Sequence, residues 1–438
     1  MSAAAQQAKK YLFAIATVYM CYLTHGVQAI ILSQNKVNFY TQWGYTDAAA
    51  GAAAVSLAIT LTGVGKFVSV WIGGEISDRI GRKLPCLLGS ILYVICFVIL
   101  LVTDNMAVAC FAGFLSGVAT SGFWDGALYP AIAEANPKYA GSTTIGIKAM
   151  ISISGIVYPL FAAMNSSAET WHINVWIPIV MSVICCVFAA LTPFVYDDER
   201  KQKVDGEDDK EGAKNAAEAE IQAAKDAMLQ KPSALTNFVT LFFGFVIMFI
   251  MYGAQQYTKA FGQNNLGLDQ VAAAGLTSIY TAGSIIAVLF WAWMMGKLRW
   301  TPIKVILIDG ILASLALFVV IIALPLNLGA GAVYFGIAVL GFSAAGGMLQ
   351  VGVTLRQQMV PGPRGRNVGM YYTFMGFASV FLPGIVGAMT SAAGETQAVW
   401  IMMILLLVAS LLSVLMSLYI IGQYKKQFGY SAMERMKD

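Results

Sequence analysis

The chain has 438 residues, of which 58% are hydrophobic and only 11% are charged, and its formal net charge is +4. Soluble globular proteins carry about 25% charged residues, so this composition excludes an ordinary soluble domain and indicates a protein with many membrane spans. The small basic excess comes from residues between the apolar segments, and it gives no reason to expect binding to nucleic acid.

Hydropathy along the chain predicts twelve membrane-spanning helices, so the expected fold class is an all-α membrane protein with two pseudo-symmetric six-helix bundles. The first six spans are expected near residues 11–33, 47–73, 84–102, 106–132, 142–164 and 173–195. The second six are expected near residues 234–258, 269–295, 303–324, 330–356, 367–390 and 397–421. The N-terminal bundle would then occupy residues 1–196, and the C-terminal bundle residues 234–438.

Between the sixth and seventh spans the composition changes abruptly, because residues 197–233 are rich in charged side chains and alanine. This pattern predicts a solvated cytosolic linker that contains a surface helix. We expect a tether that joins the two bundles, and a docking site for a regulatory partner is the alternative.

The basic residues fall mostly on one side of the predicted spans, which by the positive-inside rule places both termini in the cytosol. The residues expected on that side are Lys9, Lys10, Arg79, Arg82, Lys83, Lys138, Lys297, Arg299, Arg364, Arg366, Lys425, Lys426, Arg435 and Lys437. Only Lys36 and Lys259 are expected on the other side. The first apolar run has no signal-peptide cleavage site and is long enough to remain a span. We therefore expect a multi-pass protein of the plasma membrane that works as a monomer in the lipid bilayer.

The two predicted bundles repeat each other in sequence. Three residues around the fifth span recur around the eleventh at a constant offset of 224 residues, so that Pro137, Gly141 and Pro159 match Pro361, Gly365 and Pro383. Asp47 and Asp269, which each precede an alanine-rich span, are 222 residues apart. Parallel halves of this kind place the substrate site between them, near the middle of the membrane, and transport then proceeds by rocking of one half against the other.

A dense charge cluster lies between the second and third spans, with the sequence Gly74-Glu-Ile-Ser-Asp78-Arg79-Ile-Gly81-Arg82-Lys83. We expect it to form a short loop. The pattern Gly-x-x-x-Asp-Arg-x-Gly-Arg-Lys resembles the loop between helices 2 and 3 of the major facilitator superfamily. The resemblance implies secondary transport, with Gly74, Asp78, Arg79, Gly81, Arg82 and Lys83 as gating residues. The Asp78 carboxylate would meet nearby arginines and a helix end, and the matching loop of the second half, 296–300, lacks this Asp.

Three charged residues of the first half lie inside predicted spans, where such groups are costly and are functional candidates: Lys66, Asp125 and Lys148. All three are expected roughly 10 Å inside the cytosolic face. Desolvation favours the neutral form of a carboxyl group, whereas a neighbouring lysine favours the charged form. Our hypothesis is that Asp125 exchanges a proton during transport and that Lys66 or Lys148 is its alternating counter-ion. A static ion pair that joins helices is the alternative.

The segment Asp125-Gly-Ala-Leu-Tyr129-Pro130 resembles a motif in helix 4 of the fucose-permease branch of the superfamily, in which an acid and two small residues precede Asn-Pro. The resemblance implies that Asp125 takes part in proton symport. Tyr129 replaces the amide of that motif, and the acid of helix 1 in that branch has no counterpart in residues 28–34. The resemblance therefore supports proton coupling more than a sugar substrate.

Polar residues on the helices that line the central pore in this superfamily, and on helix 11, are candidates for substrate binding: His25, Gln28, Tyr129, Tyr252, Gln255, Gln256, Gln350, Arg356, Tyr371 and Tyr372. Amides and phenols suit a polar or amphipathic solute, and His25 is also a candidate proton relay. Hydrogen bonding between helices is the alternative role for each of them. The basic excess of Lys66, Lys148 and Arg356 over Asp125 and Asp309 would suit a substrate with a carboxylate. Asp309 itself is expected to be structural.

These features together predict a transporter that imports a small polar solute, such as a sugar or an organic acid, with protons as the coupling ion. The alternative is proton-coupled efflux of drugs or metabolites, because Gly146, Gly155 and Pro159 partly resemble the helix-5 motif of drug/proton antiporters. We expect no enzyme, because no nucleophile–base pair or phosphate-binding loop is visible. The six cysteines all lie in apolar segments and show no zinc spacing, so we expect no metal site and no cofactor.

Overall fold

The computed structural model describes residues 11–136, 140–198, 222, 225–226, 228–362 and 364–436. Eleven helices in these residues are long and apolar enough to cross a membrane. The remaining span is a bent helix, in which α2 (Leu12–Gln28) is followed directly by α3 (Ile31–Gln34). The predicted all-α membrane fold with twelve spans is therefore confirmed.

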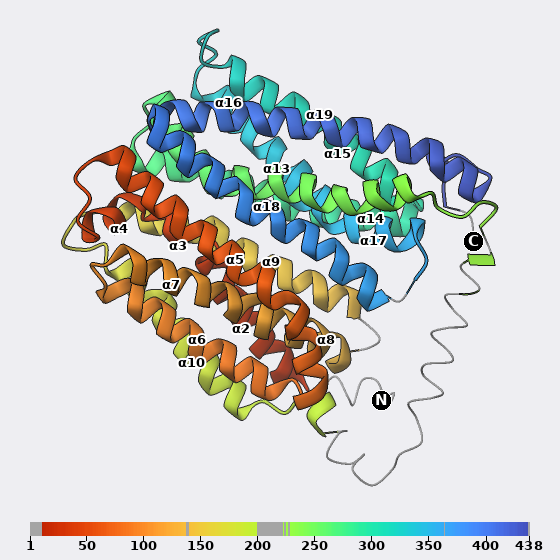
Figure 1. Ribbon diagram of the computed structural model, residues 1–438, viewed down its shortest axis with the longest axis horizontal. Coiled ribbons are helices and arrows are strands. Elements are labelled where there is room, and N and C mark those ends of the chain that lie inside the picture. The colour runs from red at the N-terminus through yellow and green to blue at the C-terminus, as the bar shows by residue number, and fades with distance from the viewer. Residues whose placement is uncertain are drawn as a thin grey trace. The chain divides into compact units, whose positions relative to one another are not determined.

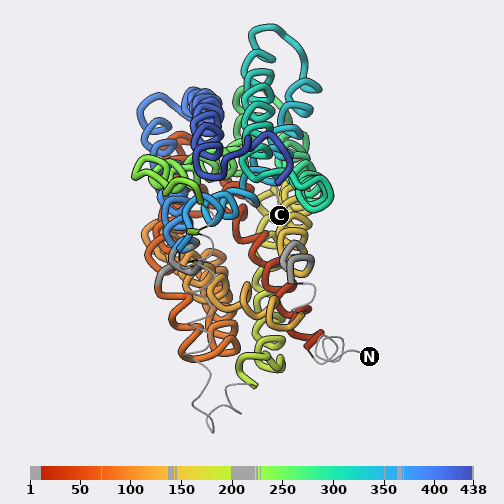
Figure 2. The backbone as a smooth tube through the Cα atoms, turned by 90° about the vertical axis from the view of Figure 1, so that its right-hand side faces the viewer, coloured from red at the N-terminus to blue at the C-terminus, as the bar shows by residue number. Residues whose placement is uncertain are grey.

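The other spans of the first half follow in chain order, and short connections join them (Figures 1 and 2). After the short helix α4 (Lys36–Gln42) they are α5 (Ala48–Ile80), α6 (Lys83–Val102), the continuous run of α7 (Met106–Gly117), η1 (Val118–Trp124) and α8 (Asp125–Ala135), α9 (Ala140–Met164) and α10 (Ile173–Leu191). The segment η1 is π-helical. Such segments are rare inside α-helices and occur frequently at functional sites.

The spans of the second half are α13 (Ala234–Leu266), α14 (Gln270–Leu298), α15 (Pro302–Ile322), the run of α16 (Ala330–Leu340), η3 (Gly341–Met348) and α17 (Leu349–Met359), α18 (Arg364–Ala393) and α19 (Glu395–Phe428). The segment η3 is π-helical, like η1. The two π-helical segments begin at residues 118 and 341, which are related by nearly the same offset as the proline and glycine repeats. This agrees with a duplicated six-helix unit.

Several helix starts carry side-chain caps that the sequence indicates. The Asp47 carboxylate accepts a hydrogen bond from the Ala50 amide at 2.7 Å at the start of α5. Asp269 does the same before α14, where its Oδ1 accepts from the amides of Val271 and Ala272 at 2.8 and 2.9 Å. A capping carboxylate satisfies amides that have no helical partner and interacts favourably with the helix dipole. The repeated aspartates therefore have a structural role.

Contacts divide the chain into two compact units. Unit 1 comprises Met1–Asp205, Lys259–Ser278 and Val380–Val399, and unit 2 comprises Gly206–Thr258, Ile279–Ser379 and Trp400–Asp438. Unit 1 therefore contains the six spans of the first half together with short terminal parts of α13, α14, α18 and α19.

Close helix contacts in unit 1 depend on glycine. Helix α5 packs along α7 and η1, and α2 packs against α9. A Cβ atom on Gly65 would lie 2.1 Å from the main-chain oxygen of Phe114, and one on Gly117 would lie 2.1 Å from that of Thr62. Small residues of this kind let membrane helices approach closely. They bring the charged residue Lys66 of α5 next to the π-helical part of the fourth span.

Unit 2 uses the same device at the matching place. Helix α15 packs against α16, η3 and α17, and a Cβ atom on Gly341 would lie only 1.8 Å from the main-chain oxygen of Tyr280. Both π-helical segments therefore begin where a glycine permits close contact with a neighbouring span.

Some sequence predictions fall outside the described residues. These are the positions of Lys9, Lys10, Pro137, Lys138 and Lys437, most of the predicted linker 197–233, and the side chains of Gln350, Arg364, Gly365 and Arg366.

Candidate functional site

Asp125 is the first residue of α8 and follows the π-helical segment η1 directly. Its Oδ1 accepts a hydrogen bond from the Tyr22 hydroxyl at 3.0 Å, and its Oδ2 accepts one from the Ser121 hydroxyl at 3.0 Å. Both donors are neutral, and no ion pair within the described residues includes Asp125. Hydroxyl groups thus hold the carboxylate in position. Its negative charge is balanced by groups that do not contact it directly.

Lys66 of α5 supplies a positive charge that balances the Asp125 carboxylate. Its ammonium interacts electrostatically with the Asp125 carboxylate and with the His25 imidazole. The side chain is half-buried, and in the described part of the chain its Nζ makes neither a hydrogen bond nor an ion pair. Lys66 and Asp125 are therefore close enough to influence each other without being locked together.

Lys148 of α9 is the second lysine near His25. It interacts electrostatically with His25, but no acidic group offsets the burial of its charge. Its Nζ makes no hydrogen bond or ion pair with any described residue. Of the two lysines that the sequence offers as counter-ions of Asp125, the electrostatic interaction therefore favours Lys66.

Aromatic and hydroxyl side chains complete this cluster. The Nδ1 atom of His25 lies 3.1 Å from the Tyr93 hydroxyl. The Tyr22 ring meets the His25 ring at 6.0 Å and the Tyr129 ring at 5.3 Å, both edge to face. Tyr129 is 37% exposed. The structure thus brings together five residues proposed from the sequence: His25, Lys66, Asp125, Tyr129 and Lys148.

Gln28 lies at the edge of that cluster, because its side chain also interacts with His25. Its side chain is buried, and its Nε2 donates a hydrogen bond to the Ser116 hydroxyl at 3.0 Å. The amide nitrogen therefore joins α2 to α7, which is the interhelical role weighed as the alternative for each polar residue.

The candidates of the second half lie on α13, α17 and α18. Arg356 is buried, and its Nη1 donates to the main-chain oxygen of Asn237 at 3.1 Å and to the Thr240 hydroxyl at 2.7 Å. These bonds join α17 to α13 inside unit 2. Tyr371 is also fully buried, next to Gly352, where a Cβ atom would lie 2.0 Å from the phenol oxygen. Both side chains thus have packing roles within unit 2.

The other candidates of unit 2 differ in exposure. Tyr252 and Gln256 are buried on α13, Gln255 is half-buried, and Tyr372 is 41% exposed on α18. Asp309 of α15 is fully buried, with its Oδ2 only 1.6 Å from the place that a Cβ atom on Gly347 would take. The burial of Asp309 agrees with the structural role expected for it.

The charge cluster after the second span is mostly helical, so the predicted ten-residue loop is wrong. Helix α5 continues to Ile80, and only Gly81 and Arg82 separate it from α6. Gly81 ends the helix with φ +102°, a conformation that favours glycine. Its amide donates to the main-chain oxygen of Ser77 at 3.0 Å. Asp78 and Arg79 therefore lie on the last turn of α5, where hydropathy alone predicted a loop because that turn is charged.

Arg82 is the centre of this cluster, and its side chain is 5% exposed. It pairs with Asp78 Oδ1 at 2.7 Å and with Glu134 Oε1 at 2.8 Å, and its guanidinium lies 4.3 Å from the centre of the Tyr196 ring. Burial disfavours the charge of Arg82, but the hydrogen bonds to Glu134 and Asp78 outweigh it and raise the pKa of the guanidinium above its usual value. Arg82 thus joins α5, α8 and the segment after α10.

The segment after α10 binds the same turn through its main chain. Asp197 Oδ2 accepts hydrogen bonds from the amides of Arg82 and Lys83 at 2.9 and 3.1 Å. A carboxylate at the start of α6 also interacts favourably with the helix dipole. Among the described residues Arg79 pairs with the exposed Glu75 alone, at 3.5 Å, and a Cβ atom on Gly74 would meet nothing within 4 Å. The gating candidates thus differ in how many contacts they make with other segments, and Arg82 makes the most.

The opposite end of α5 lies near a second polar cluster, which the sequence did not reveal. Lys259 was expected just beyond the seventh span, but α13 continues to Leu266 and Lys259 is only 4% exposed. Its Nζ donates to the main-chain oxygen of Gln34, the last residue of α3. Lys36 forms an ion pair with Glu395 at the start of α19. All these residues belong to unit 1.

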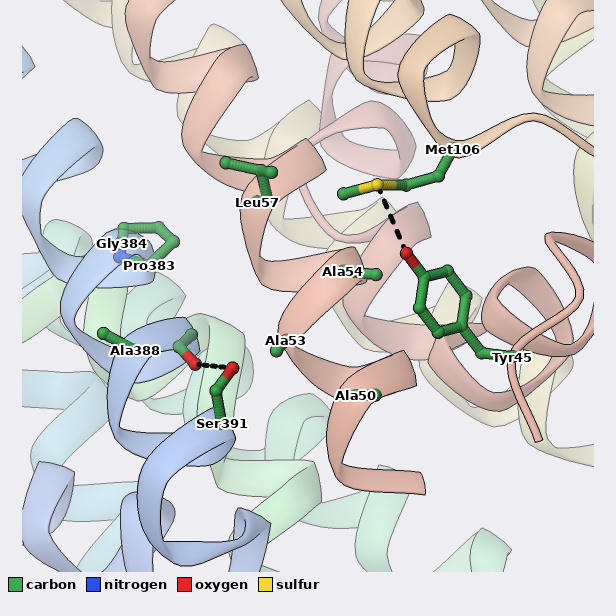
Figure 3. Close-up of a pocket in the computed structure, with 11 residues that line it drawn as sticks. Tyr45, Ala50, Ala53, Ala54, Leu57, Met106, Pro383, Gly384, Ala388 and Ser391 are labelled. Carbon is green, nitrogen blue, oxygen red and sulfur yellow. Dashed lines mark hydrogen bonds between the residues drawn. The ribbon is translucent and has the colours of Figure 1, made fainter. Parts of the chain in front are cut away.

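An apolar groove of about 370 Å³ lies at the same end, between the first turns of α5 and the last turns of α18 (Figure 3). Its walls are mainly small residues: Ala50, Ala53, Ala54 and Leu57 from α5, Pro383, Gly384, Gly387, Ala388 and Ser391 from α18, and Tyr45 and Met106 beside them. Beside it, a Cβ atom on Gly387 would lie 3.3 Å from Ser56 Cβ. Because no charged side chain lines the groove, it is distinct from the Asp125 cluster.

Comparisons with known proteins agree with this architecture. A family model described as Major Facilitator Superfamily matches residues 15–361. The inner membrane transport protein YdiM of Escherichia coli (strain K12) is 28% identical over 367 residues, which cover 84% of each chain. Among solved structures, a D-xylose-proton symporter superposes with a TM-score of 0.70 at 13% identity, over 92% of this chain and 97% of that one. A partially occluded, inward-open form of the xylose transporter XylE of E. coli gives a TM-score of 0.72 at 12% identity, over 97% and 99% of the two chains.

Proposed function

The chain belongs to the Major Facilitator Superfamily and is a multi-pass secondary transporter rather than an enzyme, and from this premise we propose that it imports a small polar solute together with protons. The proposed solute is a sugar or an organic acid. The proposal rests mainly on Asp125, a carboxylate in the fourth span. Among the described residues its two oxygens accept hydrogen bonds from the hydroxyls of Tyr22 and Ser121, which are neutral, and the charge of Lys66 lies nearby.

Proton coupling follows from the relation between Asp125 and Lys66. The charge of a carboxyl group in a span depends on the cation beside it and on access of water. When Asp125 releases its proton, Lys66 balances the new negative charge. When Asp125 takes up a proton, that electrostatic attraction disappears and α5 and α8 can shift relative to each other. The likeness to a D-xylose-proton symporter supports this proposal.

The two ends of unit 1 supply gates for alternating access. We place the Arg82 cluster in the cytosol, together with both termini, because basic residues are enriched on that side. Lys259 and Lys36 are then at the outer face. The Lys259 ammonium binds the carbonyl end of α3, where helical carbonyls lack partners and a cation is favourable. This bond and the Lys36–Glu395 pair hold the outer ends of α13 and α19 against the first half.

Lys259→Met should therefore open the outer end. Spin labels on the exposed residues Asp104 and Gln397, in a variant without native cysteines, report the distance across this end of unit 1. We expect one short distance in the parent protein and an additional longer population in Lys259→Met. Lys304→Met is the matched control, because Lys304 contacts Trp300 and Met433 in unit 2. An unchanged distance distribution in Lys259→Met would remove the gate role.

The direction of transport tests the function itself. The purified protein in proteoliposomes should accumulate a polar solute when the outside is more acidic than the inside, and it should not do so when the gradient is absent or reversed. Since one pH unit corresponds to about 1.36 kcal/mol, one-proton symport can concentrate the solute about tenfold per unit. Loss of solute from loaded vesicles, driven by the same gradient, would instead show an efflux antiporter.

A further inference from the structure

We propose that Lys148 binds an acidic group of the transported solute, so that the substrate is a carboxylate-bearing organic anion. This inference rests on the proposed function and narrows its substrate class. It also gives the two lysines of the cluster different roles, with Lys66 as the partner of Asp125 and Lys148 as the residue that recognises the substrate.

The first observation is a charge imbalance. The cluster contains two lysines and one acid. Asp125 interacts electrostatically with Lys66, and within the described residues the Lys148 ammonium forms no ion pair. Two other acids on these helices, Glu134 of α8 and Asp78 of α5, pair with Arg82 at 2.8 and 2.7 Å. A cation inside a membrane span is costly unless an opposite charge accompanies it. The described residues therefore provide no counter-ion for Lys148, and a bound anion could serve as one.

The second observation is that the part of α9 that carries Lys148 is fixed, while the Lys148 ammonium makes no hydrogen bond with the described residues. Helix α9 is fixed to α2 on both sides of it along the helix. A Cβ atom on Gly146 would lie 2.2 Å from the Tyr19 hydroxyl, and Ser154 Oγ donates to the main-chain oxygen of Leu23 at 2.6 Å. The Lys148 side chain between these contacts is half-buried, and its Nζ makes no hydrogen bond with the described residues. Three N–H donors are thus available to a ligand.

The third observation is the neighbourhood of Lys148. It interacts with His25, which also feels the charge of Lys66. An anion placed beside Lys148 would offset both positive charges near the imidazole. The partly exposed Tyr129 ring, which packs on Tyr22 at 5.3 Å, offers an apolar surface and a hydroxyl in the same cluster. Lysine suits a single carboxylate as a compact point charge with adaptable donors.

A small-molecule extract of cells serves as the probe, because it contains anions, neutral compounds and cations together. Proteoliposomes with an inward proton gradient are incubated with the extract, and the compounds inside are identified by mass spectrometry. We expect the compounds that accumulate through the parent protein to carry a carboxylate. In Lys148→Met their uptake should fall at least tenfold, and Lys148→Arg should restore part of it. Lys304→Met, which removes a lysine far from the cluster in sequence and in a different unit, should leave uptake unchanged.

The outcomes separate this inference from the function on which it rests. If the parent protein takes up no compound from the extract under any gradient, the proposed function fails. If it accumulates neutral or cationic compounds, or if a folded Lys148→Met protein takes up the same acids at the same rate, the carboxylate assignment fails and symport stands. Thermal unfolding of the purified variants distinguishes loss of folding from loss of recognition.

Discussion

Asp125→Asn is expected to abolish accumulation of the solute against its gradient. The amide has the size of the carboxyl group and can still accept a hydrogen bond from Tyr22 or Ser121, but it cannot carry a proton. With the membrane potential clamped and an inward gradient of one pH unit, the parent protein can reach an inside-to-outside ratio of about ten. The variant should reach a ratio of about one, because it only equilibrates the solute. Uptake in proteoliposomes measures both ratios.

The control for this experiment keeps the carboxylate and removes one of its donors. Ser121→Ala deletes the hydrogen bond to Asp125 Oδ2 without removing a titratable group, and a single such bond contributes about 0.5–1.5 kcal/mol. It should slow transport modestly and leave the final ratio unchanged. Exchange of labelled for unlabelled solute should persist in Asp125→Asn, which shows that the variant folds and binds. Proton-driven accumulation in a folded Asp125→Asn protein would refute the coupling role.

The spans were predictable because hydrophobic length is a strong signal, whereas their ends and bends were not. Hydropathy ended the seventh span before Lys259, but α13 continues to Leu266. The low hydropathy of a lysine ends a predicted span. Hydropathy contains no information on the hydrogen bond that the ammonium donates to a carbonyl of another span. The break between α2 and α3 contains no proline, so the sequence did not predict it. The π-helical segments begin at close glycine contacts between spans, and a single sequence does not show which spans touch.

The candidate site was predictable to the extent that charge inside a span is rare. Charge inside a span made Lys66, Asp125 and Lys148 candidates, and their roles stay predictions. The structure adds that Lys66 interacts electrostatically with Asp125. The argument from charge missed Glu134, because the predicted fourth span ended before that residue. It also missed Asp197, which stands in a charged run that reads as linker, although its carboxylate binds the amides of Arg82 and Lys83. Contacts between distant segments carry this information, and composition does not.

Arg82→Gln is expected to have the largest effect at the cytosolic gate. The guanidinium pairs with both Asp78 and Glu134, whose side chains are 69% and 24% exposed. Removing it deletes the hydrogen bonds to the less exposed Glu134, and hydrogen bonds to charged groups contribute about 1.5–3 kcal/mol each. We expect the exchange rate to fall roughly tenfold or more, since 1.4 kcal/mol corresponds to a factor of ten. The unfolding temperature of the purified protein should fall as well.

The relative effects of variants in this cluster on the exchange rate distinguish two explanations. Either the contacts of Arg82 form the gate, or the rate depends on the net charge of this face. Asp78→Asn removes the more exposed partner, so it should reduce turnover less than Arg82→Gln does. In Asp78→Asn itself, turnover should fall far more than solute affinity. Arg79→Gln is the matched control from the same turn, because its pair with Glu75 is almost fully exposed at both ends, and exposed pairs contribute little. If Arg79→Gln slowed exchange as strongly as Arg82→Gln, the buried contacts to Glu134 would not be the cause. The gate would then depend on the net charge of this face rather than on the bonds that join α5 to α8.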